Sequence, residues 1–220
     1  MNSKRVNKIT TIAMLVAIAY AVMYVGRIPI VPEPFGFLKY DPSDIVVTLG
    51  GFIWGPLVSF IVSPIVAFIE MITASGTGPI GFLMNVIQTL SFAGTATLIY
   101  KKKRTLSGAV LSLLVATALT TVVMILWNYL ITPLYTPGMT REVIKGYLVP
   151  IFLPFNLLKS AINASLTFLL YKPVVSALSK SKKIIVVENK KKGKFGFFTA
   201  VFIAIFVASV VSVILWNIVK

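Results

Sequence analysis

The chain contains neither cysteine nor histidine, and it is poor in acidic side chains, with six Asp and Glu residues against twenty-one Lys and Arg. The missing residue types exclude disulfides, thiolate nucleophiles, histidine general bases and metal sites built from Cys or His. The phosphate-binding pattern Gly-x-x-x-x-Gly-Lys-[Ser/Thr] is also missing, which excludes ATP hydrolysis by that route. The sequence therefore points away from most classes of soluble enzyme.

Charged residues of both signs are scarce as well. They make up 12% of the chain, about half of the roughly 25% found in soluble domains, while 57% of the residues are hydrophobic. Too few polar groups remain to coat a water-exposed surface, so we expect an integral membrane protein. Its 220 residues suffice for one helical bundle and leave nothing for a soluble catalytic domain.

The apolar residues are grouped into segments long enough to cross a membrane, which takes about 20 residues as a helix. The second segment is short, and Gly55-Pro56 predicts a tight break that joins it to the third as a helical hairpin. The first exceeds the apolar stretch of a signal peptide, so we expect it to be retained. Seven spans are predicted: residues 9–27, 43–55, 57–74, 80–100, 107–131, 149–171 and 195–218.

The basic residues predict the orientation, because loops rich in Lys and Arg stay in the cytoplasm. Fifteen of the twenty-one lie in clusters before the first span and after the fourth and sixth. We therefore expect a bacterial cell-membrane protein with a cytoplasmic N-terminus, divided into a bundle (1–177), a basic cytoplasmic linker (178–194) and a further membrane segment (195–220). The clusters adjoin span ends without interleaved aromatic residues, which favours anionic lipid headgroups over nucleic acid as their partner.

Two connections are predicted on the outer side. The first, residues 28–42, combines four prolines with the aromatic run Phe35-Gly36-Phe37-Leu38-Lys39-Tyr40-Asp41 and is expected to form an ordered lid. The alternative is an aromatic belt at the membrane interface. The second connection, residues 132–150, contains Thr140-Arg141-Glu142, which predicts a short surface helix.

Lys159 is the only cation inside an apolar span, and such a charge persists where it faces a partner, a cavity or a ligand. Asn156, Lys159 and Asn163 are spaced i, i+3, i+7 and share one helical face. The structural alternative pairs Lys159 with a carboxylate such as Glu70. We interpret the face as part of a binding site.

Three asparagines, Asn85, Asn128 and Asn156, are predicted at similar depth in the outer halves of different spans. A buried amide offers two donors and an acceptor that need partners. Taken singly, such residues often join helices to one another. Together with Lys159, they suit a planar ligand that alternates acceptors with an imide-type donor.

A stripe of small residues, Ala13, Ala17 and Ala21, runs along the first span. Small residues at this spacing let another helix approach closely. The stripe predicts either a contact with a partner subunit or ordinary packing within the chain.

Several motifs together resemble the riboflavin-specific substrate-binding (S) component of energy-coupling factor (ECF) vitamin transporters. They are Phe37-Leu38-Lys39-Tyr40-Asp41-Pro42-Ser43-Asp44-Ile45, Gly51-Phe52-Ile53-Trp54-Gly55-Pro56, Asn128 and Asn156-Leu157-Leu158-Lys159. The resemblance covers roughly residues 1 to 180. It implies an all-α six-helix bundle whose first outer loop covers a vitamin bound near the outer face. It departs at the C-terminus, where such components usually stop after the sixth helix.

The resemblance also implies roles for individual residues. Asn128, Asn156 and Lys159 are expected to hydrogen-bond the isoalloxazine ring, and the loop residues Leu38, Tyr40 and Asp41 to close the pocket. Ala13, Ala17 and Ala21 would meet a membrane coupling subunit driven by two cytoplasmic ATPases. Riboflavin is then a transported ligand, with FMN as a second candidate, and no cofactor is expected.

Three alternatives are separable by experiment. One is an S component for another vitamin. Another is a membrane enzyme acting on lipid, whose acid–base groups would be Glu70, Asp41 and Lys159, although Glu70 has no second carboxylate on its helical face. The third is a structural membrane partner without a ligand. A flavin spectrum in the purified protein would distinguish these readings from riboflavin capture.

Overall fold

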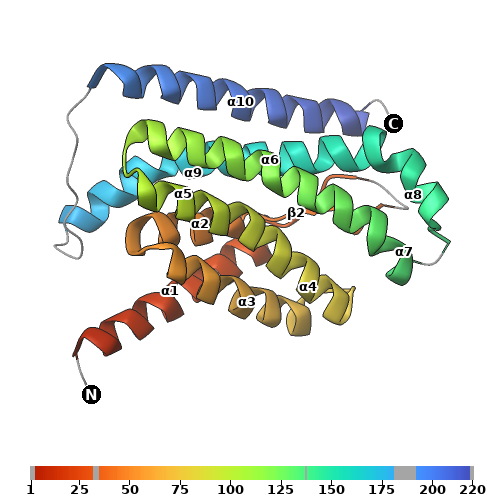
Figure 1. Ribbon diagram of the computed structural model, residues 1–220, viewed down its shortest axis with the longest axis horizontal. Helices are drawn as coiled ribbons and strands as arrows, with labels where there is room; N and C mark the ends of the chain where they lie inside the picture. The colour runs from red at the N-terminus through yellow and green to blue at the C-terminus, as the bar shows by residue number, and fades with distance from the viewer. Residues whose placement is uncertain (1–2, 32–34, 137, 181–191, 219–220) are drawn as a thin grey trace.

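The computed structural model describes residues 3–31, 35–136, 138–180 and 192–218. The described chain is a bundle of helices aligned along one long axis (Figure 1). Residues 32–34 of the predicted lid and 181–191 of the predicted linker lie outside the described part. The helices are α1 (Ser3–Gly26), α2 (Ser43–Trp54), α3 (Pro56–Thr73), α4 (Gly78–Thr89), α5 (Thr95–Lys102), α6 (Leu106–Leu130), α7 (Thr132–Tyr135), α8 (Arg141–Tyr147), α9 (Leu153–Lys180) and α10 (Lys192–Ile218).

Six of these helical stretches are long and apolar enough to span a membrane, and α2 is a shorter apolar helix. This confirms the predicted bundle with an additional C-terminal helix. Gly55 has φ 102°, a conformation that glycine adopts without strain, and Pro56 begins α3, so the predicted hairpin forms at Gly55-Pro56. Most boundaries of the predicted spans lie within about four residues of those of the helices, whereas α1 begins at Ser3 and not at residue 9, and α9 ends at Lys180 and not at residue 171.

Helix α2 lies deep in the bundle, with nine of its twelve residues buried. Gly51 permits this position, because a Cβ there would lie 2.1 Å from Ser59 Oγ on α3 and 2.3 Å from Thr97 Cγ2 on α5. A short helix that begins inside the bundle brings its first turn into the protein interior. Asp44, in that first turn, is therefore buried inside the bundle.

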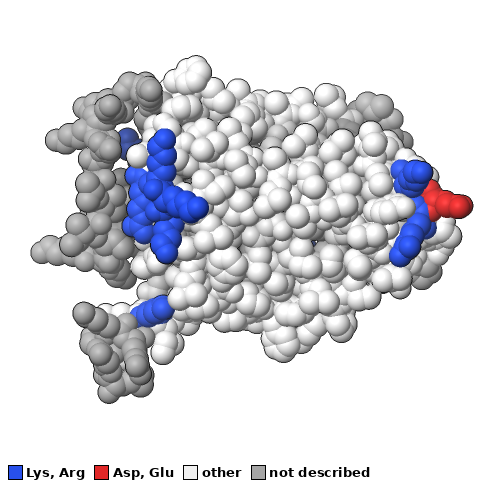
Figure 2. Space-filling model, viewed as in Figure 1, with Lys and Arg blue, Asp and Glu red and all other residues white. Residues whose placement is uncertain are grey.

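On the face shown in Figure 2, charged side chains gather at the two ends of the molecule, and the surface between them is almost free of charge. The exposed residues Lys101, Lys102, Lys103 and Arg104 lie where α5 meets α6, at the same end as the start of α1. Arg141, Glu142 and Lys145 of α8 lie at the opposite end. The uncharged zone between them has the composition of a surface that faces lipid.

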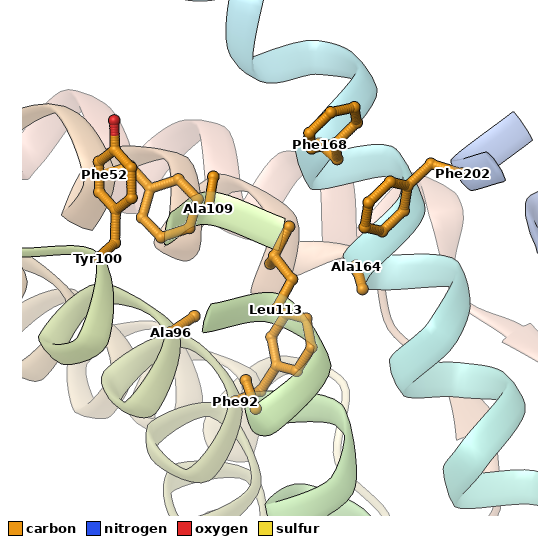
Figure 3. Close-up of a cluster of buried hydrophobic side chains, with 10 residues drawn as sticks. Phe52, Phe92, Ala96, Tyr100, Ala109, Leu113, Ala164, Phe168 and Phe202 are labelled. Atoms are coloured by element: carbon orange, nitrogen blue, oxygen red, sulfur yellow. The ribbon is translucent and has the colours of Figure 1, made fainter. Parts of the chain in front are cut away.

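An apolar cluster joins Phe92 with residues of α2, α5, α6, α9 and α10 (Figure 3). Phe202 of α10 stacks on Phe168 of α9, with ring centroids 4.4 Å apart and an angle of 16° between the planes. Helix α10 thus packs along α9, on the outside of the bundle (Figure 1). Only 11% of the apolar stretch of α10 is buried, the smallest share among the six long helical stretches described.

The loop between α1 and α2 folds back against α8 and the start of α9. Its two short strands, β1 (Ile28–Pro29) and β2 (Lys39–Tyr40), pair antiparallel. Phe35 is buried, and its ring meets those of Tyr147 at 4.9 Å and Phe152 at 5.6 Å, both edge-on. The loop aromatic Phe35 therefore packs inside the protein, which favours the lid over the aromatic-belt interpretation.

Two π-helical segments interrupt the helices, η1 (Leu90–Gly94) between α4 and α5 and η2 (Leu148–Phe152) before α9. Pro150, which lacks an N–H group, lies inside η2. Such segments often mark functional sites because they re-aim neighbouring side chains. Here η1 follows Gln88 and Thr89, and η2 ends four residues before Asn156.

Candidate ligand-binding site

The candidate site is built around the carboxylate of Asp44, which is 2% exposed. Its Oδ1 accepts a hydrogen bond from Thr89 Oγ1 at 2.6 Å. Its Oδ2 accepts from Gln88 Nε2 at 3.0 Å and from Asn163 Nδ2 at 3.2 Å. Since Asp44 also lies in the first turn of α2, the helix dipole favours its negative charge. The buried carboxylate is thereby held by donors from two other helices.

Lys159 is linked to this carboxylate through Gln88. The Lys159 ammonium, in a residue that is 6% exposed, donates to Gln88 Oε1 at 2.8 Å. An ammonium has three N–H donors, and the described residues accept a hydrogen bond from one of them. The charges of Asp44 and Lys159 therefore compensate each other across one amide group. We call Asp44, Gln88, Thr89, Lys159 and Asn163 the relay network.

Glu70 forms a separate ion pair. Its carboxylate, 2% exposed, accepts from Arg27 Nη2 and from Asn85 Nδ2, the latter at 2.6 Å. Arg27 also donates through Nη1 to the carbonyl oxygen of Ala74 at 3.4 Å. The alternative that pairs Lys159 with Glu70 is thus wrong, because Arg27 reaches Glu70 from the end of α1. The side-chain N–H of Asn85 is thus bound to the carboxylate of the Arg27–Glu70 pair.

Asn128 and Asn156 are both buried inside the bundle, at 1% and 2% exposure. Each donates through Nδ2 to a carbonyl one turn earlier in its own helix, Met124 O at 2.7 Å and Phe152 O at 2.8 Å. Thr132 Oγ1 donates to Asn128 Oδ1 at 3.1 Å. These residues lie on the contacting helices α6 and α9 and do not face lipid. That they share one outward-opening cavity with Lys159 stays a prediction.

Two buried polar atoms near the relay network have no hydrogen-bond partner among the described residues, Tyr40 Oη and Asn163 Oδ1. Burial, and next the charges of Asp44 and Asp41, raise the pKa of Tyr40 above its ordinary value, so its hydroxyl stays protonated. Buried polar groups are normally satisfied by protein, water or ligand. One donor and one acceptor are therefore available beside the network.

The loop residues predicted to close the pocket are anchored to the bundle. Leu38 is buried in an apolar cluster with Phe35, Phe152 and Phe155. The carbonyl oxygen of Asp41 accepts from Asn163 Nδ2 at 3.3 Å, and its Oδ1 accepts from the N–H of Ser43 at 2.8 Å. The loop is thus bonded to α9 and to the start of α2.

A small cavity of about 10 Å³ is lined both by Thr89 of the relay network and by Glu70 of the ion pair with Arg27. This volume holds about one water molecule. It is lined by Asp41, Ser43, Val47, Ser63, Val66, Ala67, Glu70, Asn85 and Thr89.

The alanine stripe lies on the outer surface of α1, because Ala13, Ala17 and Ala21 are all exposed. The face of α1 that packs on the bundle carries instead Leu15, Val16, Ala19 and Met23, all buried. Within the described residues, ordinary packing does not explain the stripe. A close helix contact at this position would have to come from another molecule.

Sequence reasoning named Asp44 only as part of a motif and missed its role, and it did not select Gln88 or Thr89. The available signal was the polar pair Gln88-Thr89 within an apolar span. Asn163 was placed correctly on the face of Lys159, and it is Asn163 that connects this face to Asp44.

Comparison with known proteins gives a consistent result. The family model of the ECF transporter substrate-specific component matches residues 7–171. The chain is 30% identical to the riboflavin transporter RibU of Staphylococcus aureus over 188 residues, covering 82% of this chain and 96% of that protein. It is 32% identical to the riboflavin transporter FmnP of Bacillus subtilis, covering 77% and 94%. A solved S component of a bacterial ECF transporter matches with a TM-score of 0.67 and 30% identity, over 79% of this chain and 98% of that one.

Proposed function

Because the chain belongs to the family of substrate-specific components of ECF transporters, we propose that it captures riboflavin at the outer face of the membrane for uptake. Two relatives that match most of their own length are named riboflavin transporters, which supports this ligand. The family consists of transport subunits and not enzymes. The observation that carries the proposal is the buried Lys159 ammonium, of whose three N–H donors the described residues bind one, on the same helix as the buried Asn156.

The proposed site brings Lys159 together with Asn128 and Asn156. The isoalloxazine ring of a flavin has an apolar body and one polar edge with alternating acceptors and an imide N–H. Burying the ring stabilises the complex through its apolar area, and the ammonium and the two amides satisfy the edge. Asn85, whose N–H is bound to Glu70, would form part of the polar wall through its remaining carbonyl oxygen.

The loop would act as the cover of this site. Leu38, Tyr40 and Asp41 lie over the outer end, and Tyr40 offers an unpartnered hydroxyl. FMN is a second candidate ligand, since a phosphate on the ribityl chain would not alter the ring edge.

The coupling surface would be the exposed alanine stripe of α1. Small exposed side chains let a second helix approach closely within a membrane. We propose that this helix belongs to a membrane coupling subunit driven by two cytoplasmic ATPases. The basic end of the molecule, where α1 starts, would then face the cytoplasm. Residues 1–177 would form the binding unit, 178–194 a cytoplasmic linker and 195–220 an accessory segment.

Purification followed by absorption spectroscopy tests the ligand. A flavin spectrum, and tight binding in a riboflavin titration, are expected. Asn128→Ala and Asn156→Ala should each weaken binding by about 0.5 to 1.5 kcal/mol, and Lys159→Ala by more. Asn7→Ala removes an exposed amide on α1 and serves as the matched control. Preference for another vitamin, or unchanged affinity in both Asn156→Ala and Lys159→Ala, would contradict the proposal.

A second experiment tests the coupling surface. Ala17→Trp should abolish riboflavin uptake by cells while leaving flavin binding to the purified protein near normal, because bulk at this position blocks a close helix contact. Ile18→Trp, at the neighbouring exposed position of the same helix, should leave uptake largely intact. Equal loss of uptake in both variants, or loss of binding in folded Ala17→Trp protein, would contradict the assignment.

A further inference from the structure

The relay network contains a carboxylate that the proposed ligand contacts do not use. Asp44 is separated from Lys159 by the whole amide of Gln88, and both residues are at least nine-tenths buried. A carboxylate at this depth is expensive unless it is paired and hydrogen-bonded. Its three side-chain donors show that the site is built around it.

The orientation of the Gln88 amide is chemically fixed. Its N–H donates to the Asp44 carboxylate, and its carbonyl oxygen accepts from the Lys159 ammonium. The flipped amide would set oxygen against carboxylate and N–H against ammonium, losing both hydrogen bonds. Asp44 therefore determines which way Gln88 points, and Gln88 determines where one N–H of Lys159 points.

The carboxylate itself is held from two sides. Thr89 and Gln88 are consecutive residues, which normally do not face one partner from a helix. Here they bind the two different oxygens of Asp44, just before the π-helical segment η1. Asn163 approaches from α9 and uses the same Nδ2 on Asp44 Oδ2 and on the backbone oxygen of Asp41. The network thus joins the first outer loop to the helix that carries Lys159.

We propose that Asp44 is a positioning residue for ligand capture: through Gln88 it orients the Lys159 ammonium toward the ligand, and through Asn163 it links that orientation to the covering loop. This inference rests on the proposed function, in which Lys159 touches the ligand. The other acidic groups around this region are Asp41 in the loop and Glu70 on α3. Glu70 is committed to Arg27, so Asp44 is the carboxylate bonded to the amide that holds Lys159.

The test is a double-mutant cycle on riboflavin affinity. Asp44→Asn alone should weaken binding about tenfold, and Lys159→Met alone by at least as much. In the Lys159→Met background, Asp44→Asn should have an effect of less than about twofold, because residues in one network are not additive. Glu70→Gln is the matched control, since it also neutralises a buried carboxylate, and its small effect on affinity should be the same in both backgrounds.

A rescue variant separates positioning from simple support of the fold. The exchange Asp44→Asn with Gln88→Glu puts a carboxylate directly against Lys159 and an amide at position 44. We expect it to recover most of the affinity lost in Asp44→Asn. If Asp44→Asn does not fold, Gln88→Met breaks the relay while Thr89 and Asn163 still hold Asp44, and it should reproduce the loss.

The outcomes distinguish a failure of the proposed ligand site from a failure of the positioning role of Asp44. Unchanged affinity in Lys159→Met would overturn the proposed site itself. A loss in Lys159→Met combined with unchanged affinity in Asp44→Asn or Gln88→Met would overturn the positioning role alone. The positioning role would also be overturned if the affinity loss in Asp44→Asn were fully additive with that in Lys159→Met. It would likewise be overturned if the exchange variant recovered no affinity.

Discussion

Two cations of the bundle, the partly buried Arg27 and the buried Lys159, are compensated in different ways. Arg27 touches the Glu70 carboxylate directly, and Asn85 donates to the same carboxylate. Lys159 meets the charge of Asp44 only through the amide of Gln88. The direct pair places a cation against the Glu70 carboxylate, although Nε of Arg27 is buried without a hydrogen-bond partner among the described residues. A relayed pair keeps the charges close while part of the ammonium stays available for a ligand.

This difference separates a structural role from a binding role. The Arg27–Glu70 pair ties the end of α1 to α3, and Arg27 also reaches the carbonyl of Ala74 near the end of α3. The relay network connects α2, α4 and α9 with the covering loop. Variants of the first group should therefore change stability, and variants of the second should change ligand affinity.

The largest effect is expected for Arg27→Met. Removing one partner of a buried pair leaves an uncompensated charge and costs about 3 to 5 kcal/mol in stability. Arg27 itself is 20% exposed, which places the expected loss at the lower end of that range. Thermal or denaturant unfolding of the purified protein measures it. The double variant with Glu70→Gln should recover much of the loss, and a single variant as stable as the parent would contradict the comparison.

The next largest effect is expected for Lys159→Met, which should lower ligand affinity more than stability. Hydrogen bonds to charged groups contribute about 1.5 to 3 kcal/mol, so riboflavin affinity should fall by about 10- to 150-fold. Stability should change far less than in Arg27→Met, because Asp44 keeps the donors of Gln88, Thr89 and Asn163. Titration and unfolding of the same preparation measure both quantities. A variant that unfolds easily but binds normally would reverse the assignment of roles.

Sequence analysis predicted the helices well because each depends on a local pattern. Apolar runs predict spans, and Gly55-Pro56 predicts the hairpin from the conformational preferences of two residues. The helical spacing of Asn156, Lys159 and Asn163 also correctly gave an interior face. These features need no knowledge of what lies opposite.

The pairing of charges was not predictable in the same way. Asp44 is bonded to Gln88, Thr89 and Asn163, which are 44, 45 and 119 positions away in the chain. Nothing local decides whether Lys159 meets Glu70 or Asp44, since both are buried carboxylates. Arg27 settles the matter by occupying Glu70, and its reach depends on how α1 packs against α3.

Asn85 sharpens the comparison, because the sequence placed it in the ligand site and the structure bonds it to Glu70. Asn85→Ala removes a donor to a buried carboxylate, and we expect about 1 to 3 kcal/mol lower stability. Its effect on riboflavin affinity should be smaller than that of Asn128→Ala or Asn156→Ala. Unfolding and titration, with Asn7→Ala as the exposed control, check both. A larger loss of affinity than of stability would return Asn85 to direct ligand contact.

The smallest effect on ligand affinity is expected from removing α10, by truncation after Lys183. The family match ends at residue 171, and both the Arg27–Glu70 pair and the relay network lie before that point. Helix α10 packs on α9 through the Phe168–Phe202 stack, so truncation loses an aromatic contact and its burial. Such a pair contributes about 0.5 to 1.5 kcal/mol beyond its buried area, which should lower stability.

Riboflavin affinity of the folded truncated protein should nevertheless stay close to that of the full chain. One contact could change this result, because Val213 packs against the apolar cluster that includes Phe35 and Leu38 of the covering loop. Val213→Ala in the full chain is therefore the matched variant, removing this contact while keeping α10. Normal binding in both proteins would show that the relay network works without the additional helix. Weakened binding in both would show that α10 helps to hold the loop closed, and the two charged groups would then no longer suffice to explain capture.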